Sequence, residues 1–203
     1  MLLLKLLKLP FLVAKTLDAF QGTARSIYYR SITNIPPDSK YYATARVLNL
    51  RDLNTEITIG SNSHIRGELL TFPHAGSISI GDYCYIGEHS RIWSANEIKI
   101  GNRVLISHNV NIHDCDGHPI DSLARHRHFV QIVTSGHPKD FPEMPSSPVV
   151  IGDDAWIGFN SSILKGVTIG RGAIIGAGSV VTGNVPESEL FAGNPAKFIR
   201  KVS

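Results

Sequence analysis

Aliphatic residues recur at every sixth position through the C-terminal half of the chain, and a glycine directly follows four of them. A period of six differs from the helical period of about 3.6 residues and from simple alternation, so it predicts a short strand followed by a turn. The aliphatic side chain would point into a core, and the glycine would let the chain turn without a Cβ clash. The repeating positions are Ile151, Ile157, Ile163, Ile169, Ile175 and Val181.

The same spacing appears upstream in two further blocks, with small shifts of phase between blocks, as insertions in turns would cause. Three units of six residues make one triangular coil of about 18 residues, and stacked coils would pair as parallel strands. An ordinary β-sandwich does not produce such consecutive matches at a constant spacing. We therefore predict an all-β protein built as a parallel β-helix. The upstream positions are Ile80, Ile86 and Ile92, then Ile100, Ile106 and Ile112.

The repeat breaks on a large scale only once. Residue 118 should begin the unit after Ile112, but the repeat resumes only near Val149. Residues 119–148 are therefore predicted to leave the helix as a loop. The prolines make this loop too broken for a helix, and its apolar residues make it unlike a free linker. Long loops in compact folds are usually functional, so we expect it to lie over a cleft beside residue 118.

Three parts are predicted along the chain: a helical extension at residues 1–45, the β-helix at residues 46–190 and a basic tail at residues 191–203. A glycine, asparagine and proline at residues 193–195 read as a turn that folds this tail back along the last coils. A terminal element of this kind would cap the open end of the strand stack.

The N-terminus is a leucine-rich run in which Lys5, Lys8 and Lys15 would share one face of a helix. The run is too short and too interrupted by charge to span a bilayer, and it lacks the order of a secretory signal. Two interpretations stay open, namely contact of residues 1–20 with a membrane surface or packing against a neighbouring subunit. The protein is expected in the cytoplasm, either free or peripheral at the inner membrane surface.

Composition narrows the function further. A net charge of +3, with no run of basic and aromatic residues, excludes a nucleic-acid-binding face. The two cysteines, Cys84 and Cys115, form neither a metal-ligand spacing nor a disulfide framework, so we expect reduced thiols. His113, His118 and Asp116 lie close enough in sequence to be drawn as a metal-ligand set, but the sequence does not show that their side chains converge.

The repeat and the segment IGDDAWIGFNSSILKGVTIGRGAIIGAGSVVTGNVPESELFAGNPAKFIR resemble the left-handed β-helix acyltransferases, in particular the sugar O-acetyltransferase branch with the maltose, galactoside and capsular polysaccharide enzymes. The resemblance covers roughly residues 55–203. It implies a left-handed β-helix, acetyl-CoA as co-substrate, no metal, and a homotrimer with the coenzyme bound in clefts between subunits.

The segment ISHNVNIHDCDGHPID resembles the family segment in which a catalytic histidine precedes a proline, which corresponds to His118 here. A neutral imidazole can take the proton from a sugar hydroxyl as that hydroxyl attacks the thioester, and no covalent enzyme intermediate is then needed. A group that holds the ring in one tautomer is also required. Asp114, Asp116 or a backbone carbonyl would serve, and the sequence leaves this choice open.

The resemblance also implies residues for the coenzyme and the acceptor. Thr182-Gly183-Asn184 stands where the family often has Thr-Lys-Asp, so one cation near the coenzyme is missing. The acceptor-binding asparagine of the galactoside enzyme falls near Glu88 or His89, which points away from simple galactosides or maltose. The implied coenzyme residues are Trp156, Phe159, Ala177, Thr182, Lys197 and Arg200, and the implied acceptor residues are Glu88, His89, Trp93 and Asp116.

The predicted function is therefore acetyl transfer from acetyl-CoA to a sugar hydroxyl of a surface polysaccharide or its lipid-linked precursor. An N-acetyltransferase acting on an amino-sugar nucleotide would use the same histidine and coenzyme slot. A non-catalytic β-helix is a second alternative, which the His118-Pro119 junction and the loop disfavour. A γ-carbonic anhydrase shares the fold but requires three histidines on zinc, so a metal assay would identify it.

Overall fold

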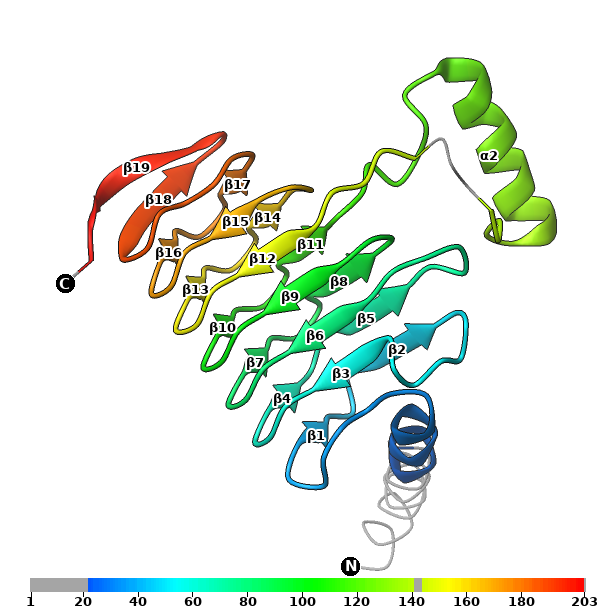
Figure 1. Ribbon diagram of the computed structural model, residues 1–203, viewed down its shortest axis with the longest axis horizontal. Coiled ribbons are helices and arrows are strands. Elements are labelled where there is room, and N and C mark those ends of the chain that lie inside the picture. Colours follow the sequence, from blue (N-terminus) through cyan, green and yellow to red (C-terminus); the bar gives the residue numbers. More distant parts are fainter. Residues whose placement is uncertain (1–21, 141–143, 203) are drawn as a thin grey trace, which may run out of the picture.

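The computed structural model describes residues 22–140 and 144–202, and these wind into a parallel β-helix (Figure 1). Each turn of the solenoid gives one short strand to each of three sheets, and about seven turns stack on one another. The strand order in each sheet advances by three elements per step until the last turn, which is the connectivity of a solenoid. The left-handed parallel β-helix predicted from the repeat and the resemblance is thereby confirmed.

The three sheets contain eight, six and five strands. The eight-stranded sheet contains β1 (Lys40–Tyr41), β4 (His64–Ile65), β7 (Tyr85–Ile86), β10 (Leu105–Ile106), β13 (Trp156–Ile157), β16 (Ile174–Ile175), β18 (Glu189–Gly193) and β19 (Ala196–Lys201). The six-stranded sheet contains β2 (Arg46–Asn49), β5 (Glu68–Thr71), β8 (Arg91–Ser94), β11 (Asn111–His113), β14 (Ser162–Ile163) and β17 (Val180–Val181). The five-stranded sheet contains β3 (Ile57–Ile59), β6 (Ile78–Ile80), β9 (Ile98–Ile100), β12 (Val149–Ile151) and β15 (Thr168–Ile169).

The repeating aliphatic residues form the core of the prism. In the eight-stranded sheet Ile86, Ile106 and Ile157 are paired in register and are fully buried. The six-stranded sheet repeats this arrangement with Ile112 and Ile163. Each such side chain contributes about 1.5–3 kcal/mol by leaving water, so the stacked turns stabilise one another through a continuous apolar column.

The glycines of the repeat are explained by close stacking at the corners. A Cβ added at Gly87 would lie 2.5 Å from the backbone carbonyl of Ser107 in the next turn. No side chain fits in that space without separating the coils. The predicted role of glycine, to avoid a Cβ clash at the turn, is therefore confirmed at Gly87, where the clash would be with the next coil.

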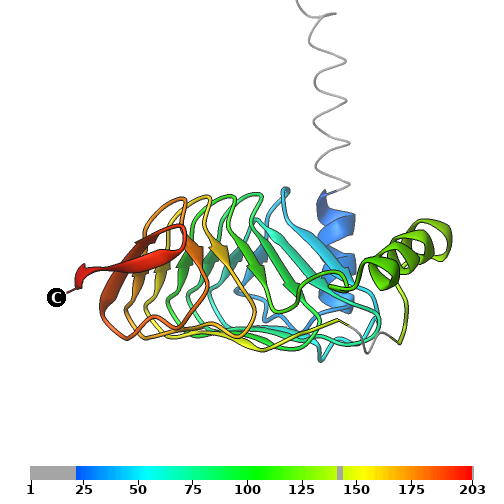
Figure 2. The same cartoon turned by 90° about the horizontal axis from the view of Figure 1, so that it is seen from above.

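The prediction that residues 119–148 contain no helix is wrong, because the segment contains α2 (Ser122–Ser135). Asp121 caps its N-terminus by accepting a hydrogen bond from the backbone N–H of Ala124 at 2.8 Å. Gly136 ends it with a φ of 85°. The prolines that argued against a helix all lie outside this stretch. Figure 2 shows α2 (green, right) outside the stacked coils, which run across the picture.

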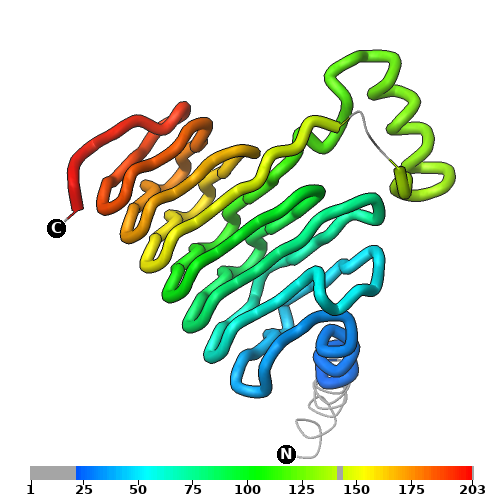
Figure 3. Tube along the Cα trace, in the orientation of Figure 1, coloured from blue at the N-terminus to red at the C-terminus, as the bar shows by residue number. Residues whose placement is uncertain are grey.

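The C-terminal residues form an antiparallel pair, β18 and β19, at the end of the eight-stranded sheet. β18 pairs in parallel with β16, so the last coil is covered by this hairpin (Figure 3). The strands do not follow the predicted boundaries, because β1 lies before residue 46 and β18 extends across residue 190. The division into residues 1–45, 46–190 and 191–203 remains a proposal.

Residues 22–31 are helical and pack on the first turn of the solenoid. Tyr29 is buried, with its ring 5.4 Å from that of Tyr41 in an edge arrangement. The predicted amphipathic face with Lys5, Lys8 and Lys15 lies outside the described residues, so its role stays a prediction. None of the helices in residues 22–140 and 144–202 could span a lipid bilayer.

Candidate active site

The chain leaves the solenoid at the corner between the six-stranded and five-stranded sheets, where a buried carboxylate holds the turn. Asp114 is fully buried and accepts hydrogen bonds from the Ser94 hydroxyl at 2.6 Å and from the backbone N–H groups of Ala95 at 2.7 Å and Asn96 at 2.9 Å. Burial raises the pKa of this carboxyl, and the donors act in the opposite direction. Asp114 thus anchors the departing chain to the preceding turn.

The other acidic candidate for orienting His118 is also engaged elsewhere. Asp116 is exposed and its carboxylate accepts a hydrogen bond from the ammonium of Lys165 at 2.5 Å. Between them, Cys115 pairs with Ser146 on the returning limb, and burial raises the pKa of the Cys115 thiol to about 11, so it is no nucleophile. Both carboxylates that the sequence offered for orienting His118 are thus bound to other groups.

His118 is instead paired with a second histidine. Gly117 turns the chain with a φ of 76°, and the exposed ring of His118 then meets His128 of α2. The two Nδ1 atoms are 3.1 Å apart and the rings meet edge to face at a centroid distance of 5.1 Å. His128 is buried, and this burial, followed by the nearby His118, His137 and His74, lowers its pKa. Sequence analysis did not predict this pair, because His128 reaches His118 only through the fold of α2.

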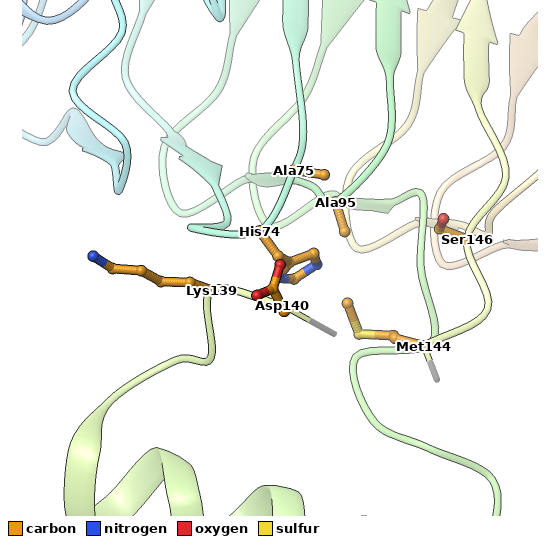
Figure 4. A pocket seen from close by; sticks show the side chains of 7 residues that line it. All are labelled: His74, Ala75, Ala95, Lys139, Asp140, Met144 and Ser146. Atoms are coloured by element: carbon orange, nitrogen blue, oxygen red, sulfur yellow. The ribbon is translucent and has the colours of Figure 1, made fainter. Parts of the chain in front are cut away.

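The returning limb of the excursion is held against the coils by apolar contacts. Met144 packs with Ala95, Cys115 and Phe72 in a small cluster separate from the main core. A cavity of about 480 Å³ lies between this limb and the turns after β5 and β8, as Figure 4 shows. Its lining residues are His74, Ala75, Ala95, Lys139, Asp140, Met144 and Ser146.

Two of the implied acceptor residues lie on or just after strands of the six-stranded sheet, Trp93 on β8 and Asp116 after β11. Trp93 donates a hydrogen bond from its indole N–H to Glu68 at 2.9 Å, and its ring lies 5.0 Å from that of His113. His113 and Asp116 line a second cavity of about 340 Å³ beside this pair. The structure thus brings Trp93 and Asp116 to the same side of the molecule as His118.

The other two acceptor residues, Glu88 and His89, lie in the turn before β8, at the opposite end of that strand. Glu88 accepts a hydrogen bond from Arg66 at 2.7 Å, and His89 adopts a φ of 60°. This turn belongs to the corner between the eight-stranded and six-stranded sheets. Glu88 and His89 are therefore separated from His118 within one chain by the width of the six-stranded sheet.

Three of the implied coenzyme residues lie at or beside that same corner. Trp156 on β13 and Phe159 in the following turn are 50% and 47% exposed. Phe159 stacks on His108 of the preceding turn with the ring centroids 5.2 Å apart, and Ala177 lies in the turn above. The others are elsewhere, since Thr182 follows β17 at the corner of His118 and exposed Lys197 and Arg200 lie on β19.

Comparison with known proteins identifies the family. Residues 148–183 match the family described as bacterial transferase hexapeptide (six repeats). A solved hexapeptide-repeat-containing acetyltransferase from Vibrio cholerae is 31% identical, with a TM-score of 0.52, over 66% of this chain and 71% of that one. The chain belongs to the hexapeptide-repeat acetyltransferases. The resemblance inferred from the repeat and the C-terminal segment is confirmed.

Two curated relatives of this hexapeptide-repeat chain come from Escherichia coli (strain K12). The putative lipopolysaccharide biosynthesis O-acetyl transferase WbbJ is 36% identical over 62% of this chain and 61% of the relative. Galactoside O-acetyltransferase is 33% identical over 72% of this chain and 64% of the relative. The chain thus spans about three fifths of the length of the curated relatives it matches.

The predicted site residues of this hexapeptide-repeat chain lie at two corners of the triangular coil. His118, Asp116 and Trp93 lie toward one end of the strands of the six-stranded sheet, whereas Glu88 and Phe159 lie at the other end. Figure 1 shows the excursion on the side of the coils away from β10, β13 and β16. Within the described residues, no three His, Cys, Asp or Glu side chains gather as a metal site would require.

Proposed function

We propose that this chain is an acetyl-CoA-dependent O-acetyltransferase that acts on a sugar hydroxyl of a surface polysaccharide or its lipid-linked precursor. The observation that carries the proposal is the exposed His118, which follows a left-handed glycine at the start of the excursion in a member of this acetyltransferase family. The Nδ1 atom of His118 is engaged by His128, which leaves Nε2 as the ring nitrogen for a substrate.

The reaction needs one proton acceptor and no nucleophile from the protein. Nε2 of His118 accepts the proton of the sugar hydroxyl while the hydroxyl oxygen attacks the thioester carbonyl carbon. The tetrahedral intermediate then collapses, the carbon–sulfur bond breaks, and the departing thiolate takes the proton back from the imidazolium. The products are the acetyl ester and free CoA, and His118 returns to its neutral form.

The division of the site supports assembly into a homotrimer. If copies pack side by side, His118, Asp116 and Trp93 of one copy face Glu88, His89, Trp156, Phe159 and Ala177 of the next. Exposed apolar side chains are available for such packing on both sides, with Leu105 on β10 52% exposed and Val133 on α2 62% exposed. Closed symmetric assemblies are the usual form of such oligomers.

The coenzyme would lie along the corner of Phe159 and Ala177, with Trp156 beside the thioester arm. Backbone N–H groups of stacked turns suit the carbonyl oxygens of the pantetheine amides, and the exposed side chains of Lys197 and Arg200 on β19 would approach the phosphates. Thr182 lies at the corner of His118, so its proposed contact would come from the copy that provides the histidine.

The acceptor is proposed to be a glycan because a tryptophan and polar groups flank the cavity near His118. Trp93 offers an aromatic face, and His113, Asn111 and Asp116 offer hydrogen-bonding groups beside it. Relatives named as O-acetyltransferases of lipopolysaccharide biosynthesis and of galactosides favour a hydroxyl over an amine as the acceptor.

The proposal is tested by incubating the purified protein with acetyl-CoA and a panel of glycans, amino-sugar nucleotides and lipid-linked sugars, with thiol release as the measurement. Thiol release that depends on a hydroxyl-bearing glycan is the expected result. Turnover restricted to amino-sugar nucleotides would replace O-acetylation by N-acetylation. No turnover with any member, together with bound zinc in a metal assay, would support the carbonic anhydrase alternative.

A further inference from the structure

Helix α2 buries a histidine where an apolar residue would be expected. Of its 14 residues, Ala124 and His128 are the buried ones, and they lie four apart on one face. Leu123 and Val133 are left 68% and 62% exposed on the same helix. An imidazole is costly to bury unless it is hydrogen-bonded, so its place on this face calls for a partner, and the described partner is His118.

The helix is built directly onto the His118 segment. The guanidinium of Arg125 donates hydrogen bonds to the carbonyl of Ile120 at 2.8 Å and to that of Pro119 at 3.3 Å. Asp121 caps the helix three residues after His118. These hydrogen bonds tie the first turn of α2 to the chain that bears His118, and His128 lies opposite His118 one turn further along the helix.

We infer that His128 is a positioning residue for acetyl transfer, which accepts a hydrogen bond from Nδ1–H of His118 and so keeps the lone pair of His118 on Nε2. This inference rests on the proposed function, in which His118 is the general base. In a neutral imidazole only one nitrogen carries hydrogen, and the partner of that nitrogen decides which one it is. A carboxylate does this in many hydrolases, and a neutral histidine does it here.

His128 has to stay neutral for this role, and its surroundings favour that form. It is 5% exposed, and the groups that face it are His118, His137 from the end of α2 and His74 from the turn after β5. Burial and these histidines lower the pKa of His128 and so favour its neutral ring, which can accept a hydrogen bond at Nδ1 when Nε2 carries the hydrogen. When His118 takes up the substrate proton, the bond becomes one between an imidazolium and a neutral ring, which is stronger.

The first test is spectroscopic and needs no acceptor. In protein labelled with ¹⁵N at histidine, long-range proton–nitrogen correlation spectra at mildly alkaline pH report which nitrogen of each ring carries hydrogen. We expect His118 to show the Nδ1–H tautomer in the wild type and in His128→Asn, whose amide oxygen accepts from the same direction. In His128→Leu a mixture of tautomers is expected. An Nε2–H tautomer of His118 in the wild type would overturn the inference.

The second test is kinetic and uses acetyl-CoA with the glycan that releases most thiol. His128→Leu is expected to lower kcat about tenfold to a hundredfold, a part of what a general base contributes, with KM for acetyl-CoA unchanged. The acid limb of the profile of kcat/KM against pH, which belongs to the coupled pair, should move to lower pH. His128→Asn should recover most of kcat, and His126→Leu on the exposed face of α2 should stay within about twofold of wild type.

The outcomes separate this inference from the proposed function. A wild-type kcat and pH profile in His128→Leu, or a His128→Asn variant as impaired as His128→Leu, would overturn the role of His128. If His118→Ala is inactive in that same experiment, the proposed function stands without it. If His118→Ala retains activity, the general-base assignment itself fails.

Discussion

In the stacked coils each turn buries an aliphatic side chain at the same place, so that Ile86, Ile106 and Ile157 lie in one register. In the excursion between β11 and β12 nothing repeats, and α2 buries only Ala124 and His128. The coils are stabilised by burial that any neighbouring turn can supply. The excursion is held by individual polar contacts, in which Asp114, Asp121 and Arg125 each have a specific partner. Damage in the two regions should therefore have different consequences.

The largest effect is expected from His118→Ala in the excursion. Loss of a general base lowers turnover about a hundredfold to ten-thousandfold. The ring lies outside the main core but pairs with buried His128, so circular dichroism should show a folded protein whose stability falls by no more than about 1–3 kcal/mol. Thiol release within tenfold of wild type would contradict the assignment, and so would a large loss of stability with proportional loss of activity.

Mixing two inactive variants tests whether the site is shared between copies. His118→Ala and Trp156→Ala are each expected to be impaired, the second through a higher KM for acetyl-CoA. In randomly mixed trimers about a quarter of the interfaces combine an intact His118 with an intact Trp156 of the next copy. Activity at low acetyl-CoA should therefore rise to about a quarter of wild type after the two chains are coexpressed. Light scattering should show a trimer, and an additive mixture without recovery would place the whole site in one chain.

The stability of the coils should depend on the buried side chains of their core and much less on exposed side chains. Ile106→Ala is expected to lower the free energy of unfolding by about 2–5 kcal/mol, because the stacked neighbours cannot close the resulting cavity. Ile199→Ala on β19, where the side chain is 55% exposed, is the matched control and should change it by less than about 0.5 kcal/mol. Urea denaturation measures both, and equal effects would mean that the column of isoleucines is not the stabilising element.

Asp114→Asn tests the polar anchor of the excursion and should have the smallest of these effects. The amide NH₂ of asparagine cannot accept from the donors that surround this carboxylate, so a loss of about 1–3 kcal/mol is expected. The folded-state pKa of Asp114 is raised, so the contribution of this group to wild-type stability is greatest below its ordinary pKa and falls as pH rises toward the raised one.

The loss of unfolding free energy caused by Asp114→Asn should therefore be larger at about pH 4 than at neutral pH, as measured by urea midpoints across that range. An unchanged deficit at both pH values would mean that Asp114 does not titrate in the native state.

The sequence was informative where the structure repeats itself. A spacing of six predicted the coils, the core isoleucines and the corner at which the chain departs after Ile112, because the same local unit is stacked many times and its signal accumulates. It did not predict α2, because the prolines argued against a helix and all of them lie beyond the helix that Asp121 and Gly136 cap. Nor did it distinguish Asp114 from Asp116, whose partners Ser94 and Lys165 come from other turns.

The hexapeptide pattern by itself thus determined the architecture, the family and the histidine at the point of departure. Only the tertiary structure decided that His128 is the partner of His118, that Asp114 is a buried anchor and that Glu88 and Phe159 lie at a different corner from His118. The physical reason is the range of the interactions. The buried positions recur every six residues, so the sequence itself shows them. Hydrogen bonds and site geometry depend instead on which distant segments the stacked coils and the excursion bring together.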